Sequence, residues 1–389
     1  KLKMKTLGWT LPLLSLGLAS SRAWSAQQPL VAKHEDSTQL SELLELHKSL
    51  VEIPSVSRAE GEVGRFLQHY LEERGYTVYA QPVDGGDGNN TDRHNIFAYL
   101  GGSNKTRVLV TSHIDTVPPF LPYERRGSEI WGRGTVDAKG SVAAQIAAVE
   151  SLRRSNEIAD EGDVALLFVV GEENGSGGMA AANDLGVSWE AVIFGEPTEL
   201  KLARGHKGGL GVALSAEGKA GHSGYPELGA NAIDLLVRGL AGLQSAALPW
   251  SDEFGNTTLN VGVIQGGVAD NVIPAQASAS AFVRIATDRI DDTKAIIEEA
   301  VHSAAPEVQV KFTYGRGPVP INYDIQGFDS VIVNYGTDIP NLKGSHKRYL
   351  YGPGSVLVAH SDHEHLEVSE LEAAVKGYEI LITEALKMN

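Results

Sequence analysis

The first half of the chain alternates two kinds of hydrophobic pattern. From Thr38 to about Leu185, segments such as LSELLELHKSLVEI, EVGRFLQHYLEERG and GSVAAQIAAVESLRR space their apolar residues three and four apart, as amphipathic helices do. Short continuous apolar runs lie between them, in NIFAYL, RVLVTS and DVALLFVV, and are typical of buried strands. This alternation predicts an α/β fold with a largely parallel sheet that helices cover on both faces.

The pattern changes between about Gly208 and Thr313. The order there is strand (GLGVALSAEG), helix (ANAIDLLVRGLAGLQ), two strands (TLNVGVIQGG and QASASAFVRI), helix (DDTKAIIEEAVHSA) and strand (VQVKFTY). This order predicts a compact α+β unit inserted into the first domain, and the amphipathic end of the chain, LEVSELEAAVKGYEILITEALKM, predicts a helix that returns to that domain. We therefore expect the first domain over 27–207 and 314–389, and the inserted domain over 208–313.

The N-terminal segment has a different pattern of charged and apolar residues. Three lysines precede an apolar run, LGWTLPLLSLGLAS, which ends in the small-residue stretch SSRAWSA, and this order predicts a secretory signal peptide over residues 1–26. The apolar run is too short for a membrane span, so we expect a secreted protein with no membrane anchor. Export would make the sequons at Asn89, Asn104 and Asn256 acceptors for glycosylation, whereas the sequon at Asn174 directly follows two candidate site residues and is expected to stay unmodified.

The composition of the chain excludes several kinds of partner and site. The formal net charge of -16 would repel a nucleic-acid backbone, so we expect no nucleic-acid partner. The chain has no cysteine, which excludes disulfides, thiolate metal sites and a cysteine nucleophile. Any metal site must therefore use histidine, aspartate and glutamate.

Such residues follow the predicted strands. His113 and Asp115 end the strand RVLVTS, the adjacent Glu172 and Glu173 follow DVALLFVV, and Glu196 follows AVIFG. In an open parallel sheet the carboxyl ends of strands are where ligands bind. Taken alone, His113 is equally consistent with a buried core histidine. For the two glutamates a solvated loop is the weaker alternative. Adjacent acids at a buried strand end repel each other unless a cation or a proton is present.

More metal-binding residue types lie in two loops. Asp137 sits in GRGTVDAKG just before a helix, where a simple N-cap is the alternative, and GPGSVLVAHSDHEHLEV supplies His360, His363, Glu364 and His365. Imidazole mixed with carboxylate suits zinc, cobalt or manganese. Because the set exceeds what one tetrahedral ion uses, it predicts two ions bridged by a carboxylate, about 3.5–4 Å apart.

Seven motifs carry a family resemblance. HIDTVP, GRGTVDAKG, GEENGSGG, GEPT, AGHSGYPELGANAI, GGVADNVIP and GPGSVLVAH occur in this order, and with them the chain resembles the zinc aminoacylase/carboxypeptidase family of metallopeptidases. That family includes carboxypeptidase G, acetylornithine deacetylase and succinyl-diaminopimelate desuccinylase. The resemblance covers nearly the whole chain after residue 26. It implies a phosphorylase/hydrolase-like catalytic domain with an inserted lid domain, through which a homodimer can form.

The resemblance also implies a ligand set. His113 and Glu196 would hold one zinc ion, Glu173 and His360 the other, and Asp137 would bridge both. The choice of His360 over its two neighbouring histidines rests on the family spacing between GPG and AH.

Further roles follow from the same resemblance. Asp115 would orient His113, and Glu172 would act as the general base. His222 of AGHSG would stabilise the oxyanion, and Asn271 and Arg284 would bind the carboxylate of the substrate; the alternatives are a surface histidine for His222 and a structural ion pair for Arg284. His206 receives no role.

The predicted function is therefore a secreted two-zinc enzyme that hydrolyses an amide bond next to a free carboxylate. A carboxypeptidase acting on peptides is the first interpretation. An N-acyl-amino-acid deacylase or a dipeptidase would use the same centre. A binding protein with an inactive centre is disfavoured, because the base, the bridging residue and all the expected ligands are present.

Overall fold

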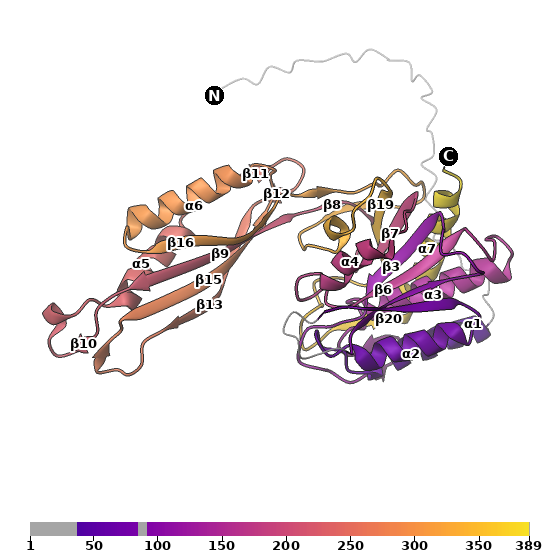
Figure 1. The fold of residues 1–389 in the computed structure, drawn as a ribbon, viewed down its shortest axis with the longest axis horizontal. Helices are drawn as coiled ribbons and strands as arrows, with labels where there is room; N and C mark the ends of the chain where they lie inside the picture. The colour runs from indigo at the N-terminus through magenta and orange to yellow at the C-terminus, as the bar shows by residue number, and fades with distance from the viewer. Residues whose placement is uncertain (1–36, 85–91, 389) are drawn as a thin grey trace, which may run out of the picture.

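The computed structural model describes residues 37–84 and 92–388, which form two domains side by side (Figure 1). The predicted signal peptide over 1–26 and the sequon at Asn89 lie outside these residues, so both remain predictions. No helix in the described part of the chain is long and apolar enough to cross a membrane.

A six-stranded sheet forms the centre of the first domain. Five of its strands run in one direction, and only β2 is antiparallel to both of its neighbours, in agreement with a largely parallel sheet. Every residue of the three central strands β6, β3 and β7 is buried, as their continuous apolar runs predict. The two edge strands, β1 and β19, are less regular in sequence, and the hydrophobic pattern did not identify them. The order across the sheet is β1 (Thr77–Pro82), β2 (His94–Tyr99), β6 (Val164–Val169), β3 (Val108–His113), β7 (Ala191–Gly195) and β19 (Lys347–Tyr351).

The two faces of this sheet are covered differently. Four helices share a buried core with one face: α1 (Ser37–Glu52), α2 (Gly61–Glu72), α3 (Lys139–Arg154) and α7 (Val368–Leu386). The other face packs against the short helix α4 (Gly177–Ala182), loops, and a small sheet made of β17 (Val319–Pro320), β8 (Leu202–His206) and β18 (Ser330–Val333). The expectation of helices on both faces is therefore met only in part on this second face, where one short helix lies beside loops and a small sheet. Successive strand residues point to opposite faces, so both faces must be covered, but a small sheet can cover one as well as helices can.

The second domain is a four-stranded antiparallel sheet with two helices on one face. Residues alternate between buried and exposed along β15, because one side of each strand meets the helices and the other does not. The sheet continues to Arg316, three residues beyond the predicted boundary at Thr313. Its elements, in sheet order, are β13 (Thr258–Gly266), β15 (Gln276–Ile285), β9 (Gly208–Glu217) and β16 (Gln309–Arg316), with helices α5 (Ala232–Gln244) and α6 (Ile290–Ala304).

The chain enters the second domain from β8 and returns through β17, and these two strands pair side by side. Short elements complete the fold. The pair β10 (Gly221–His222) and β14 (Val272–Ile273) lies at the far end of the second domain from the first (Figure 1). The others are β4 (Glu124–Arg126), β5 (Glu129–Trp131) and β20 (His365–Glu367) in one sheet, β11 (Trp250–Ser251) with β12 (Gly255–Asn256), and the 3-10 helices η1 (Asn183–Leu185), η2 (Pro226–Leu228) and η3 (Ile339–Asn341).

Candidate metal centre

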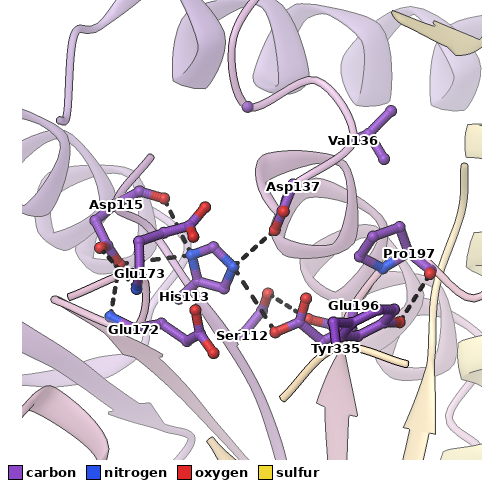
Figure 2. A network of polar contacts seen from close by, with 12 residues as sticks. Ser112, His113, Asp115, Val136, Asp137, Glu172, Glu173, Glu196, Pro197 and Tyr335 are labelled. Carbon is purple, nitrogen blue, oxygen red and sulfur yellow. Dashed lines mark hydrogen bonds and ion pairs between the residues drawn. The ribbon is translucent and has the colours of Figure 1, made fainter. Parts of the chain in front are cut away.

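Three neighbouring strands deliver acidic and imidazole side chains to one edge of the main sheet (Figure 2). His113 is the last residue of β3, and Glu196 directly follows β7. Glu172 and Glu173 follow β6, which lies on the other side of β3. The structure therefore brings together the side chains that the strand-end pattern singled out.

Asp137 lies at the middle of this cluster. Its Oδ1 is 3.0 Å from Nε2 of His113, and its Oδ2 is 3.1 Å from Nε2 of His360. Beyond the two histidines, Glu196 lies 3.8 Å from His113, and Glu173 lies 2.9 Å from His360. One carboxylate with one oxygen toward each histidine has the arrangement of a bridging ligand between two half-sites.

The donor set fits divalent cations. Ligand atoms of His113, Asp137 and Glu173 all lie within 4.8 Å of one another. The set is hard carboxylate oxygen plus imidazole nitrogen, which is the chemistry that zinc, cobalt and manganese accept. His113 and Glu196 would form one half-site, and Glu173 and His360 the other.

The protonation equilibria of the cluster reflect crowding of like charges. Burial, reinforced by neighbouring carboxylates, raises the pKa of Glu172 and of Glu196 well above the ordinary glutamate value. Burial also raises the pKa of Glu173. The hydrogen bonds to Asp137 and Glu173 raise the pKa of the His360 imidazole to about 10. These carboxylates therefore require positive charge among them, which protonated histidines or bound cations supply.

Asp115 holds two parts of the centre in place. Nδ1 of His113 donates to the main-chain oxygen of Asp115 at 3.0 Å, so Nε2 is left to face Asp137. The Asp115 carboxylate accepts the backbone N–H groups of Glu172 and Glu173 at 3.0 and 3.2 Å, and the Ser57 hydroxyl at 2.7 Å. Asp115 thus fixes both the histidine and the loop that carries the two glutamates.

Glu364 fixes the loop that carries Asp137. It is buried, and its Oε1 accepts the backbone N–H groups of Gly134, Val136 and Asp137 at 2.9, 3.2 and 3.3 Å. Its Oε2 lies 2.6 Å from Nη1 of Arg133. All of these contacts lie within the protein, so Glu364 supports the centre without belonging to the ligand set.

The structure also separates the three nearby histidines. Only His360 of the three contacts Asp137 and Glu173. Nδ1 of His363 lies 3.0 Å from Asp362, and His365 stacks on the Trp131 ring with 4.7 Å between centroids.

A cleft of about 400 Å³ opens over the cluster, between the first domain and the base of the second. Arg284 of β15 lines this cleft together with Glu172 and Glu173. Its guanidinium lies 4.8 Å from the centre of the Phe282 ring and makes no hydrogen bond or ion pair with any described residue. Burial lowers the pKa of Arg284. The structural ion pair considered for Arg284 is therefore not observed in the described part of the chain.

His222 and Asn271 are not brought to this cleft. His222 belongs to β10, and Asn271 lies beside it, since its oxygen accepts the N–H of Ser223 at 3.0 Å. Both residues belong to or adjoin the pair β10 and β14 at the far end of the second domain, and His222 is exposed. Strands such as β9, with 10 residues, span roughly 30 Å and separate that end from the cleft. The roles given to His222 and Asn271 thus remain predictions that one chain alone does not satisfy.

Asp338 is a buried acid that the sequence analysis missed, and its charge acts on Glu172 and Glu196 of the cluster. It is buried and follows the apolar strand β18, and its Oδ1 has no hydrogen-bond partner in the described structure. Burial raises the pKa of Asp338 to about 7, although a hydrogen bond with Ser176 acts to lower this pKa. Like the other acids, Asp338 comes after a strand, but that strand, β18, lies in the small sheet.

Comparisons with known proteins agree with this geometry. A sequence model described as a peptidase dimerisation domain matches residues 204–309, and one described as peptidase family M28 matches residues 95–191. A peptidase M20 domain-containing protein of Sordaria macrospora is 45% identical, over 94% of this chain and 89% of its own length. A protein of Aspergillus clavatus named "probable carboxypeptidase" is 46% identical, over 90% of this chain and 91% of its own length.

A solved structure shares the fold. The M20 family metallo-carboxypeptidase of Sulfolobus solfataricus superposes with a TM-score of 0.71 at 16% identity, over 89% of this chain and all of that one. The likeness therefore covers both domains.

Proposed function

The chain belongs to the M20 family of peptidases and is a metal-dependent peptidase, and from this premise we propose that it is a two-zinc carboxypeptidase. The observation that carries the proposal is the placement of Arg284. A half-buried guanidinium, which contacts the Phe282 ring but makes no hydrogen bond or ion pair with a described residue, lines the same cleft as the metal ligands. A bidentate partner for a substrate carboxylate has that character.

The ligands fall into two half-sites around Asp137. His113 and Glu196 would hold one ion, and Glu173 and His360 the other, on the contacts described above. When bound, two such ions lower the pKa of the attacking water and polarise the carbonyl of the scissile bond. The hydrogen bond from Nδ1 of His113 to the main-chain oxygen of Asp115 would leave Nε2 of His113 to bind an ion.

Glu172 would carry the proton. It lines the cleft next to the ligand Glu173, yet it does not contact Asp137 or either histidine of the cluster. Its carboxylate would take a proton from the attacking water and deliver it to the nitrogen of the departing residue. The water oxygen would bond to the carbonyl carbon, the peptide C–N bond would break as its nitrogen takes the proton, and the products would be a shortened peptide and a free amino acid.

His222 and Asn271 would complete the site from a second copy of the chain. They lie together at the far end of the second domain, which is the domain that matches the dimerisation model. In a dimer formed through this domain, the far end of one copy could reach the cleft of the other and place His222 at the oxyanion.

We also propose that the protein is secreted, on the basis of its N-terminal pattern of lysines, apolar run and small residues. N-terminal sequencing of the protein recovered from culture medium tests this proposal. The expected first residue lies between Ala23 and Gln27. Protein found only inside the cells with residues 1–26 retained would contradict it.

The activity is tested with the zinc-loaded protein and three sets of compounds: peptides with a free C-terminus, the same peptides amidated, and N-acetyl amino acids. Mass spectrometry identifies the products. We expect release of the C-terminal residue from the free peptides only. If only N-acetyl amino acids are hydrolysed, the enzyme is a deacylase and the proposed carboxypeptidase activity is wrong. Equal cleavage of free and amidated peptides would show that Arg284 does not select a carboxylate.

A further inference from the structure

A second hollow adjoins the cleft and is mostly apolar. This side pocket has a volume of about 420 Å³, and Arg284 and Tyr335 line both it and the cleft. Val331 and Val333 of β18 form its wall, and Leu357 lies in the loop that leads to His360. The side pocket therefore begins at Arg284, the proposed partner of the substrate carboxylate, and extends away from the proposed metal ligands.

The rim of the side pocket exposes large apolar side chains. Leu357 is 82% exposed and Val356 36% exposed. Their loop is anchored to Glu199, since Ser355 Oγ donates to Glu199 at 3.0 Å and the Glu199 N–H donates to the Gly354 oxygen at 2.9 Å. Leu357 is thus an exposed residue at the edge of the pocket.

Charged groups around the side pocket are already engaged. Glu199, the acid that lines it, pairs with Lys201 at 2.9 Å in addition to Ser355. In the neighbouring cleft, Arg316 donates to the Pro340 oxygen at 3.0 Å. Arg284 is therefore the cation of the side pocket that is available to a ligand, and a second charge on the ligand would find no partner beside it.

The geometry of an amino acid connects these features. In a C-terminal residue the carboxylate and the side chain branch from the same Cα atom. When Arg284 holds the carboxylate and the scissile carbonyl lies at the metal centre, the side chain is within reach of the side pocket.

We propose that the side pocket binds the side chain of the residue that is released, and that the enzyme prefers a large apolar residue there, such as leucine or phenylalanine. This inference rests on the proposed carboxypeptidase function. Burial of an apolar side chain against Val331, Val333 and Leu357 is favourable, whereas a charged side chain would lose its hydration without gaining a partner.

The test uses N-blocked dipeptides that share the first residue and end in leucine, phenylalanine, alanine, aspartate or lysine. We expect kcat/KM of the zinc-loaded protein to be at least roughly tenfold higher for the leucine and phenylalanine substrates than for the others. Leu357→Lys places a cation at the rim. It should raise the ratio of kcat/KM for aspartate over leucine by at least roughly tenfold, with unchanged zinc content.

Tyr79→Lys is the matched control, because Tyr79 is a 51% exposed apolar residue on β1, outside both hollows. It should leave the ratio unchanged. The side pocket is refuted, and the carboxypeptidase function is retained, when residues are released but Leu357→Lys alters the ratio no more than Tyr79→Lys does.

Absence of hydrolysis with every substrate would refute the carboxypeptidase function instead. Binding then tests the pocket by itself, using the non-hydrolysable carboxylates isocaproate and propionate in calorimetric titrations of the zinc-loaded protein. We expect isocaproate to bind more tightly, and this difference to vanish in Leu357→Lys. Equal binding of the two carboxylates to the unaltered protein overturns the proposal.

Discussion

The carboxyl edge of the main sheet and the far end of the second domain carry similar residue types in opposite settings. At the sheet edge, His113 is 1% exposed, and its two ring nitrogens face Asp115 and Asp137. At the far end, His222 is exposed, and its Nδ1 accepts only the N–H of Gly224, at 3.0 Å. The first histidine is buried and held through both ring nitrogens, whereas the second is exposed and has one such hydrogen bond and an edge contact with the Tyr225 ring.

The difference arises from the supports behind each residue. At the sheet edge, Asp115 and Glu364 each accept several backbone N–H groups and fix the loops that carry the ligands. At the far end, β10 and β14 pair over two residues each. A preorganised centre and an exposed, weakly supported end suggest that the far end acquires its function in contact with a second chain.

The largest effect is expected from Glu172→Gln. Loss of the proton carrier should lower kcat by roughly 10²- to 10⁴-fold, while the zinc content stays near that of the unaltered protein because Glu172 is not a ligand. Steady-state kinetics and elemental analysis of the same preparation check both parts. Near-normal kcat would remove Glu172 from the mechanism, and loss of zinc would make it a ligand.

The next largest effect concerns the supports of the sheet edge. Glu364→Ala leaves Arg133 buried without its partner and three backbone N–H groups without their acceptor, so we expect the free energy of unfolding to fall by about 3–5 kcal/mol. Chemical denaturation measures this change. Asp362→Ala, a 96% exposed residue in the same loop, should change the free energy by less than about 0.5 kcal/mol. Equal changes in the two variants would contradict the role of Glu364.

The same contrast explains how far the sequence could predict the site. His113 and Glu196 follow continuous apolar strands, and the carboxyl ends of parallel strands must meet at one edge, so local pattern is enough to bring them together. Asp338 also comes after a strand, but that strand, β18, lies in the small sheet and has only four residues, of which two are half-buried and one is exposed. Such a short and partly exposed run gives a weak hydrophobic signal.

The fold was predictable where burial is continuous. The buried strands β3, β6 and β7 were identified from their apolar runs, whereas the edge strand β1 is mostly exposed or half-buried and was not. The position of His222 could not be predicted either, since residue pattern indicates a strand or a loop but does not encode the direction in which one domain extends from another. The two chain segments that join the domains pair there as β8 and β17.

His222→Ala tests whether the far end of the second domain takes part in catalysis. We expect kcat to fall by roughly 10²- to 10³-fold when an oxyanion donor is lost, with stability within about 0.5 kcal/mol of the unaltered protein because the side chain is exposed. Unfolding and refolding His222→Ala together with Glu172→Gln should restore about a quarter of the sites. Half of the dimers would be mixed, and each mixed dimer would contain one complete site. Normal kcat in His222→Ala would exclude the far end from catalysis, and no recovery on mixing would place His222 in its own chain's site.

The smallest effect is expected from serine-to-alanine substitutions, one made in each of the two regions. Ser57→Ala removes the hydroxyl that donates to Asp115 at 2.7 Å, so the free energy of unfolding should fall by about 1.5–3 kcal/mol, the range for a hydrogen bond to a charged group. Asp115 would keep its two backbone donors, so the loop of Glu172 should remain in place and kcat should fall only modestly. Ser223→Ala at the far end removes an exposed hydroxyl and should change stability by less than about 0.5 kcal/mol. If the two serine variants lose equal stability in chemical denaturation, the sheet edge is no better supported than the far end, and the contrast between a preorganised centre and an end that needs a second chain is lost.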